Sequence, residues 1–161
     1  MDPLFALITG TLEAAEFQFE AAEEHQTVRL LIQGDAAHWK TYLRVLNGRQ
    51  IAIYSTPDLR VPEDRRVAMA ELIARANFGI VLGNFELDFS DGEIRYKTSI
   101  DSGGEQFDPA ILLHLLNANL ANTNRYVAGI MGVAFGELSP EEAVRRCEAG
   151  EQLAPPTSGP A

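Results

Sequence analysis

"GNFELDFSDGEIRYKTSID", residues 83–101, is the most strongly patterned stretch of the chain. Apolar and polar residues alternate on both sides of Asp91-Gly92. An Asp-Gly pair between two alternating runs is a strong short-range signal of a β-hairpin. We therefore predict two antiparallel strands joined by a tight turn, and the remaining elements are placed around them.

The register of this hairpin decides whether its charged residues are better explained by a structural role or by a functional site. A two-residue turn pairs Asp88 with Arg95 and Glu86 with Lys97, so that each acid faces a base. The other face is then apolar, as in an antiparallel sheet with one buried side; it carries Phe85, Leu87, Phe89, Ile94 and Tyr96. Exposed ion pairs contribute only about 0.2–1 kcal/mol each. We interpret the acids as setting register and solubility, and not as catalytic carboxylates.

Three more strands are expected in residues 27–56, which are rich in β-branched and aromatic residues and are punctuated by Gly34-Asp35 and Asn47-Gly48. A three-residue loop at positions 46–48 sets Leu43 opposite Ile51. The same register places an apolar set on one face of the sheet, namely Leu43, Val45, Ile51 and Ile53.

Helices are predicted where a proline begins an apolar periodic run; a capping residue precedes the proline in three of them, and two acids follow it in the other. They begin near residues 3, 62, 109 and 140, and the third should break or bend between Asn119 and Asn124. The element order is helix, three strands, helix, two strands, helix, helix. This order predicts an α+β domain with a single antiparallel sheet of about five strands and helices on one side.

The length of 161 residues suits one compact domain, which we place at residues 1–150. The last stretch, "EQLAPPTSGPA" at residues 151–161, is rich in Pro, Gly and Ser and has few apolar groups to bury. We expect this tail to be disordered.

Composition excludes several classes of function. The chain has 23 acidic and 13 basic residues, a net charge of −10, which argues against nucleic acid and anionic membranes as partners. Its start lacks the basic region of a secretory signal, and so we expect a cytoplasmic protein. One cysteine, Cys147, and three scattered histidines offer no metal-ligand spacing. We expect neither metal nor cofactor.

Aromatic side chains on the outer side of the sheet are the candidate partner-binding residues. With the apolar set above assigned to the core, Trp39, Tyr42 and Tyr54 are expected on the outer side. Such aromatic area on a solvated face marks a candidate contact patch. The alternative is that the first helix or a loop covers these residues.

The second helix is apolar around more of its circumference than a sheet alone can bury. Closed two-fold pairing is the commonest way for a chain to bury such a surplus. We therefore expect a homodimer with an interface that contains Val67, Ala70, Ile73 and Ala74.

Several pieces of the chain occur in the order found in one bacterial family: "NFG" at 77–79, "GNFEL" at 83–87, "DGEIRYKT" at 91–98 and "SPEEA" at 139–143. On these pieces, residues 25–148 resemble the YbjN-like family, described as sensory transduction regulators. The first helix and the tail carry none of the resemblance.

The resemblance implies a fold similar to type III secretion chaperones, which are small, acidic, usually dimeric proteins that bind segments of other proteins. It implies no reaction and no catalytic residues. A non-enzymatic protein-binding or regulatory module of this chaperone-like kind, with a partner of unknown identity, is therefore the leading hypothesis. The alternatives are a small-molecule sensor and a hydrolase that uses His38 or His114 with a nearby acid.

Overall fold

The structure is a computed structural model that describes residues 1–106 and 108–153. Its elements in chain order are α1 (Pro3–Ala14), β1 (Glu20–Ala22), the 3-10 turn η1 (Glu23–His25), β2 (Thr27–Gln33), β3 (His38–Leu46), β4 (Gln50–Pro57), the 3-10 turn η2 (Glu63–Arg65), α2 (Arg66–Gly79), β5 (Asn84–Leu87), β6 (Ile94–Asp101), α3 (Pro109–Ala134) and α4 (Pro140–Ala149). The strands form one antiparallel sheet in the order β1-β2-β3-β4-β6-β5.

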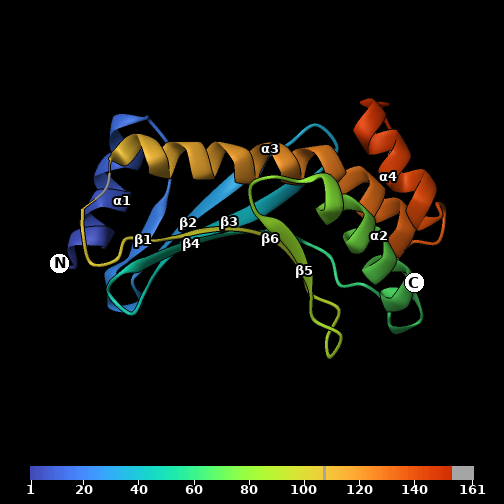
Figure 1. Cartoon of the computed structure of the whole chain (residues 1–161), viewed down its shortest axis with the longest axis horizontal. Coiled ribbons are helices and arrows are strands. Elements are labelled where there is room, and N and C mark those ends of the chain that lie inside the picture. Colours follow the sequence, from blue (N-terminus) through green and yellow to red (C-terminus); the bar gives the residue numbers. More distant parts are fainter. Residues whose placement is uncertain (107, 154–161) are drawn as a thin grey trace.

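The four described α-helices lie on one side of the sheet, and α3 runs along its length (Figure 1). The first helix packs on β2, β3 and α3, whereas α2 and α4 pack together with α3 at the other end. No described helix covers the opposite face. The predicted α+β class and one-sided helical layer are therefore confirmed.

A sixth strand, β1, is missing from the sequence prediction. It has three residues, Glu-Ala-Ala, none of which favours a strand. It forms because it pairs with β2, where Glu20 lies opposite Arg29 and binds its guanidinium. Tertiary pairing overrides local propensity here.

Side-chain caps and prolines begin three helices as predicted. Asp2 Oδ1 accepts from Leu4 N at 2.8 Å, Asp108 Oδ1 accepts from Ala110 N at 2.8 Å, and Ser139 Oγ accepts from Glu142 N at 3.2 Å. Each of these caps precedes a proline in the first turn.

A break in the third helix, one form of the expected interruption, is wrong, because α3 continues unbroken from Pro109 to Ala134. Two of the polar residues that suggested this break, Asn119 and Thr123, are buried in the protein. Asn119 is fully buried and donates to Ile53 O at 3.0 Å, and Thr123 Oγ1 donates to Asn119 O at 2.8 Å. These bonds use the side-chain donors of both residues without interrupting the helix, whereas Asn119 Oδ1 has no hydrogen-bond partner among the described residues.

Both predicted hairpin registers are wrong by two residues, although the faces are right. Leu43 lies opposite Ile53, because the loop after β3 uses positions 47–49 and not 46–48. Glu86 lies opposite Arg95, and not opposite Lys97. A shift of two residues returns each side chain to the same face, which is why the apolar pattern does not detect it.

The second hairpin also has a longer loop than predicted. Asp88 does not pair with Arg95; its Oδ1 accepts from Ser90 N at 2.8 Å inside the loop. The backbone closes this loop by a bond from Asp88 N to Glu93 O at 2.8 Å. Phe89, which the predicted register placed in the apolar face, is in the loop and 54% exposed.

The core under the helices has two apolar clusters. One gathers residues of α1, β2–β4 and the first half of α3; the other gathers residues of α2, β5, β6, α4 and the second half of α3. Strands β3, β4 and β6 and helix α3 also contribute buried polar residues. We name this set the polar seam: Thr41, Ser55, Thr98, Asn119 and Thr123. Thr41 and Ser55 bond each other at 2.7 Å, and Asn119 Nδ2 donates to Thr98 Oγ1 at 3.2 Å.

The end of the described chain stays close to the helices. Arg145 pairs with Glu151 at 3.2 Å, and Leu153 packs on the second cluster. Residues 154–161 of the expected tail lie outside the described residues. The single-domain boundary at residue 150 and the disorder of the tail stay predictions.

Candidate functional site

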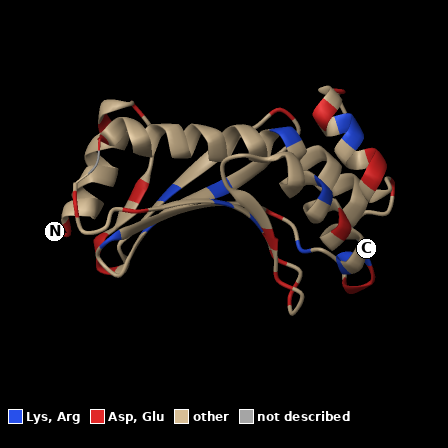
Figure 2. Ribbon diagram, in the orientation of Figure 1, with Lys and Arg blue, Asp and Glu red and all other residues tan. Residues whose placement is uncertain are grey.

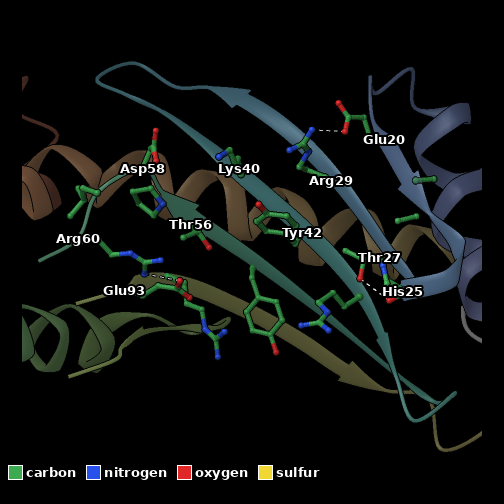
Figure 3. Close-up of a pocket in the computed structure, with 17 residues that line it drawn as sticks. Glu20, His25, Thr27, Arg29, Lys40, Tyr42, Thr56, Asp58, Arg60 and Glu93 are labelled. Carbon is green, nitrogen blue, oxygen red and sulfur yellow. Dashed lines mark hydrogen bonds and ion pairs between the residues drawn. The ribbon is translucent and has the colours of Figure 1, made fainter. Parts of the chain in front are cut away.

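The uncovered side of the sheet forms a hollow with a volume of about 990 Å³ (Figure 3). Five strands and the segment 57–60 contribute its walls. Alternation along the strands explains which side chains point there. In β3, Thr41 and Leu43 are buried under the helices, and so Tyr42 between them faces the hollow.

Two tyrosines occupy the middle of this open face. Tyr42 and Tyr54 are direct cross-strand partners on β3 and β4, and both line the hollow. Arg29 lies beside Tyr42 on β2, and Lys97 lies beside Tyr54 on β6. These four residues form one row across the central strands of the sheet.

Two further cations flank Tyr42 along its own strand. Lys40 and Arg44 lie two residues before and after it, and therefore on the same face. The tyrosine pair is thus flanked by cations in both directions. We name Tyr42, Tyr54 and these cations, Arg29, Lys40, Arg44 and Lys97, the tyrosine–cation patch.

The charge of this face opposes that of the whole chain. Every Lys or Arg within a strand projects to the open side: Arg29, Lys40, Arg44, Arg95 and Lys97. Acidic positions gather mainly in loops and turns, as Figure 2 shows. A protein with net charge −10 therefore presents a basic sheet face.

Some of these cations are already neutralised. Arg29 is bonded to Glu20, and Lys97 to Glu86. By contrast, Lys40 and Arg44 make no ion pair or side-chain hydrogen bond within residues 1–106 and 108–153. The two unpaired cations lie along β3.

Glu86 also organises the neighbouring strand. Its Oε2 accepts from Arg95 Nε at 2.6 Å, and the Arg95 guanidinium lies 4.3 Å from the centre of the Tyr54 ring. Burial raises the pKa of Glu86, but hydrogen bonds from Lys97 and Arg95 outweigh burial and lower that pKa. The carboxylate is therefore ionised wherever the protein is folded near neutral pH.

At one end of the hollow the charges are balanced differently. Arg60 Nη1 lies 2.7 Å from Glu93 Oε2 and 3.4 Å from Asp91 Oδ2 (Figure 3). With Asp58 nearby in the lining, this end carries more acids than bases. The basic character is thus confined to the central strands.

The placement of Trp39 on the outer side is wrong. Trp39 is 2% exposed and lies on the helix-covered face. The reason is parity: position 39 is an even number of residues from Leu43, and so the two side chains share a face. Tyr42 and Tyr54 do face the open side, while their role in binding stays a prediction.

The proposed dimer residues lie along α2 with different exposures. Val67 is 75% exposed and Ala74 is exposed, whereas Ala70 and Ile73 are half-buried, and Ile73 packs on the second cluster. Sequence reasoning missed the apolar residues that continue this surface, Phe78 at 96% and Val81 at 93% exposed. Their apolar character was visible, but their exposure depends on how α2 meets α4.

His38 and His114, named for the hydrolase alternative, are both exposed. Neither pairs with a carboxylate in the described part of the chain, where the one histidine ion pair joins His25 and Glu24. The same residues contain no cluster of three or more potential metal ligands. Burial raises the pKa of the Cys147 thiol, which leaves it unreactive.

No described helix is both long and apolar enough to cross a membrane. Among curated proteins, none matches the chain. Among solved structures, a chain from the "Structure of the HopA1-SchA Chaperone-Effector Complex" is similar to it, with a TM-score of 0.46 and 15% identity over 75% of this chain and 93% of that one.

A family model described as "Putative bacterial sensory transduction regulator" matches residues 5–132. The match includes the first helix, which the quoted sequence pieces did not, and it ends before α4. It spans well over half of the chain, and so the chain belongs to the YbjN family.

Proposed function

We propose that the open sheet face holds an extended segment of a partner protein, and that the chain acts as a non-enzymatic binding or regulatory module of the bacterial cytoplasm. One observation carries the proposal: the cross-strand pair of Tyr42 and Tyr54 lies half-exposed in the middle of an uncovered, hollowed face. Tyrosines supply large contact area at a small cost in side-chain entropy, and they are enriched where proteins bind proteins.

The shape of the site supports a segment over a compact ligand. The hollow extends over the open face between His25 and Arg60 and is open to solvent along this length, with charged side chains on several strands beside its apolar rings and stems. Pockets for small molecules are usually enclosed and mostly apolar. A segment lying on the strands would instead bury the tyrosine rings and leave its outer side in water.

A small-molecule sensor is the second candidate, because a volume of about 990 Å³ falls at the upper end of the range for small-molecule sites. The two functions differ in the ligand that occupies the hollow, which is a peptide segment in the first and a small metabolite in the second. A sensor binds a metabolite with the same residues, and its melting temperature rises when that metabolite is present.

The test is capture of partners by the tagged protein, followed by direct binding of peptides from each captured partner to the purified protein. We expect a Tyr42→Ala, Tyr54→Ala double variant to lose peptide binding by about ten-fold or more, at an unchanged melting temperature. Ile111→Ala, at an exposed apolar residue of α3 on the helical side of the sheet, is the matched control. Equal binding by both variants, or binding of small metabolites alone, would contradict the proposal.

We further propose that the chain forms a homodimer through α2. Val67, Ala74 and Phe78 are exposed on this helix, Ala70 is half-buried among them, and Val81 extends the apolar surface beyond its end. Ile73 contributes less than the sequence suggested, because it is half-buried within its own chain. A two-fold axis near Ala74 would place Phe78 of each copy against the small Ala70 side chain of the other.

Light scattering after size exclusion tests the dimer at about 50 µM protein, because the population of a dimer depends on the protein concentration. We expect a mass of twice the 17.6 kDa of one chain, and a single-chain mass for Val67→Lys with Phe78→Lys. Leu31→Lys, which adds a lysine at an exposed apolar position far from α2, should leave the mass doubled. A single-chain mass for the unaltered protein would end this proposal.

A further inference from the structure

Resting on the proposed function, we propose that the segment held on the open face is acidic and lies along β3. Its two carboxylates, four residues apart, pair with Lys40 and Arg44 and bracket an apolar residue that covers the tyrosine pair. The recognised pattern is acid–x–apolar–x–acid in an extended conformation.

Charge complementarity supplies the first step. Of the cations in the tyrosine–cation patch, Arg29 and Lys97 already bind Glu20 and Glu86. Lys40 and Arg44 have no acidic partner within the described residues, although the chain as a whole has ten more acids than bases. Two cations without an acidic partner in the described part of the chain, beside two half-buried tyrosines, favour a ligand that carries negative charge.

Strand geometry supplies the spacing. Lys40 and Arg44 are four residues apart on one strand, which corresponds to about 13 Å at about 3.3 Å per residue. An extended segment lying over β3 has the same repeat, and every second side chain points to the sheet. Its first and fifth residues then meet the two cations, and its third meets Tyr42.

The direction of the segment follows from which cations are free. A segment running across the strands would meet the row of Arg29, Tyr42, Tyr54 and Lys97. Its acids would have to displace Glu20 and Glu86 from existing ion pairs. A segment along β3 displaces neither carboxylate, because Lys40 and Arg44 are unpaired.

A polyanion fits the face less well than a short acidic segment. Glu93, Asp91 and Asp58 surround Arg60 at one end of the hollow, and Glu23 and Glu24 lie near the other. A nucleic acid strand long enough to cover the tyrosine–cation patch and extend beyond it would meet acids at both ends. Two carboxylates spaced about 13 Å apart stay within the basic centre.

The experiment is a selection of random nine-residue peptides, displayed on phage or messenger RNA, against the full-length purified protein. Binders that also bind the Tyr42→Ala, Tyr54→Ala variant are removed, so that only ligands of the open face remain. We expect enrichment of Asp or Glu at two positions four apart, with an apolar residue midway between them.

Synthetic versions of the enriched peptides are then measured against two charge-reversal variants. Lys40→Glu with Arg44→Glu should weaken binding by about ten-fold or more, because two attractive contacts become repulsive. Arg75→Glu with Arg125→Glu changes the net charge equally on the helical side and should weaken binding by less than about two-fold. Moving the two acids to adjacent positions should weaken binding by about five-fold or more.

The outcomes separate this inference from the proposed function. Enriched peptides without paired acids, or equal loss in both charge-reversal variants, would overturn the acidic segment while leaving segment binding intact. No enrichment at all would overturn both. Tighter binding of single-stranded oligonucleotides than of any selected peptide, lost in the Lys40→Glu, Arg44→Glu variant, would assign the open face to nucleic acid instead.

Discussion

The two faces of β3 differ sharply although their residues alternate along one strand. On the helix side, Thr41 and Leu43 are fully buried, within the polar seam and the first apolar cluster. On the open side, Lys40 and Arg44 have no acidic partner among residues 1–106 and 108–153, and Tyr42 is half-buried. The strand thus uses one set of side chains for folding and the next set for a surface, and adjacent substitutions should separate stability from binding.

The largest expected effect on stability comes from a substitution on the buried face of β3. Leu43→Ala should lower the free energy of unfolding by about 3 kcal/mol, because it removes buried methyl groups and leaves a cavity. Arg44→Ala, one residue away, should change it by less than about 0.5 kcal/mol. Urea unfolding followed by circular dichroism measures both. Equal losses for the two variants would break the contrast between the faces.

The polar seam should matter nearly as much as the apolar clusters. Asn119→Ala removes the bonds to Ile53 O and Thr98 Oγ1, and it should lower the free energy of unfolding by about 2 kcal/mol. Asn117→Ala is the matched control, because Asn117 is exposed on the same helix. If both variants unfold at the same urea concentration, the seam does not contribute to stability.

Acid should lower the stability of the protein by protonating carboxylates at its surface, because no Asp, Glu, Lys, Arg or His is buried among the described residues. Hydrogen bonds from Arg49, Gln50 and the Gly103 backbone lower the pKa of Asp101 to about 2. Hydrogen bonds from Arg145 and Arg146 lower the pKa of Glu142 to about 2. A carboxyl group with a depressed folded-state pKa stabilises the fold above its unfolded pKa, and this stabilisation is lost as pH falls through the folded value.

The midpoint of urea unfolding should therefore stay level from about pH 7 to 5 and fall from about pH 4.5 to 2. In Asp101→Asn the decline should be shallower, since one of the depressed carboxyl groups is gone. A decline of the same steepness in both proteins would show that the Arg49 pairing adds nothing to stability.

A small effect on stability is also expected at Glu86, whose carboxylate already pairs with Arg95 and Lys97 on the open face. Glu86→Gln should change the free energy of unfolding by less than about 1 kcal/mol, because Glu86 and its partners are partly exposed. The substitution also removes the acid that neutralises Lys97 and Arg95. Binding of an acidic segment should therefore tighten by about two- to five-fold, as measured by calorimetry. Weaker binding would mean that Glu86 itself contacts the partner.

Much of the fold could be predicted from the local pattern of the sequence. Strand faces were predictable because side chains alternate with a period of two, and helix starts were predictable because Asp2, Asp108 and Ser139 bond the free N–H groups of the first turn. The same parity would have placed Trp39 with Leu43 on the covered face had it been applied consistently. The alternation of Lys40, Tyr42 and Arg44 was also visible, and it is the signal that could have found the basic centre of the site.

Register and neighbours across the sheet could not be obtained in this way. Asn47 and Gly48 both have positive φ, 54° and 64°, which places the turn one residue later than the predicted loop. In the second hairpin, the bonds of Asp88 within its loop set the register. Each error equals two residues, and a shift of two leaves the pattern of faces unchanged.

The sequence by itself determined the α+β class, the parity of the five predicted strands and three of the four predicted helix starts, because these depend on periods and caps encoded within a few residues. The second helix was expected near residue 62, but α2 begins at Arg66 after a 3-10 turn and has no side-chain cap. Only the tertiary structure decided that Arg29, Tyr42, Tyr54 and Lys97 form one row. It also decided that Asn119 is buried, that α2 leaves Phe78 exposed and that no described helix covers the open face. These features join residues distant in the chain, and their positions follow from turn geometry and helix packing that local sequence pattern does not specify.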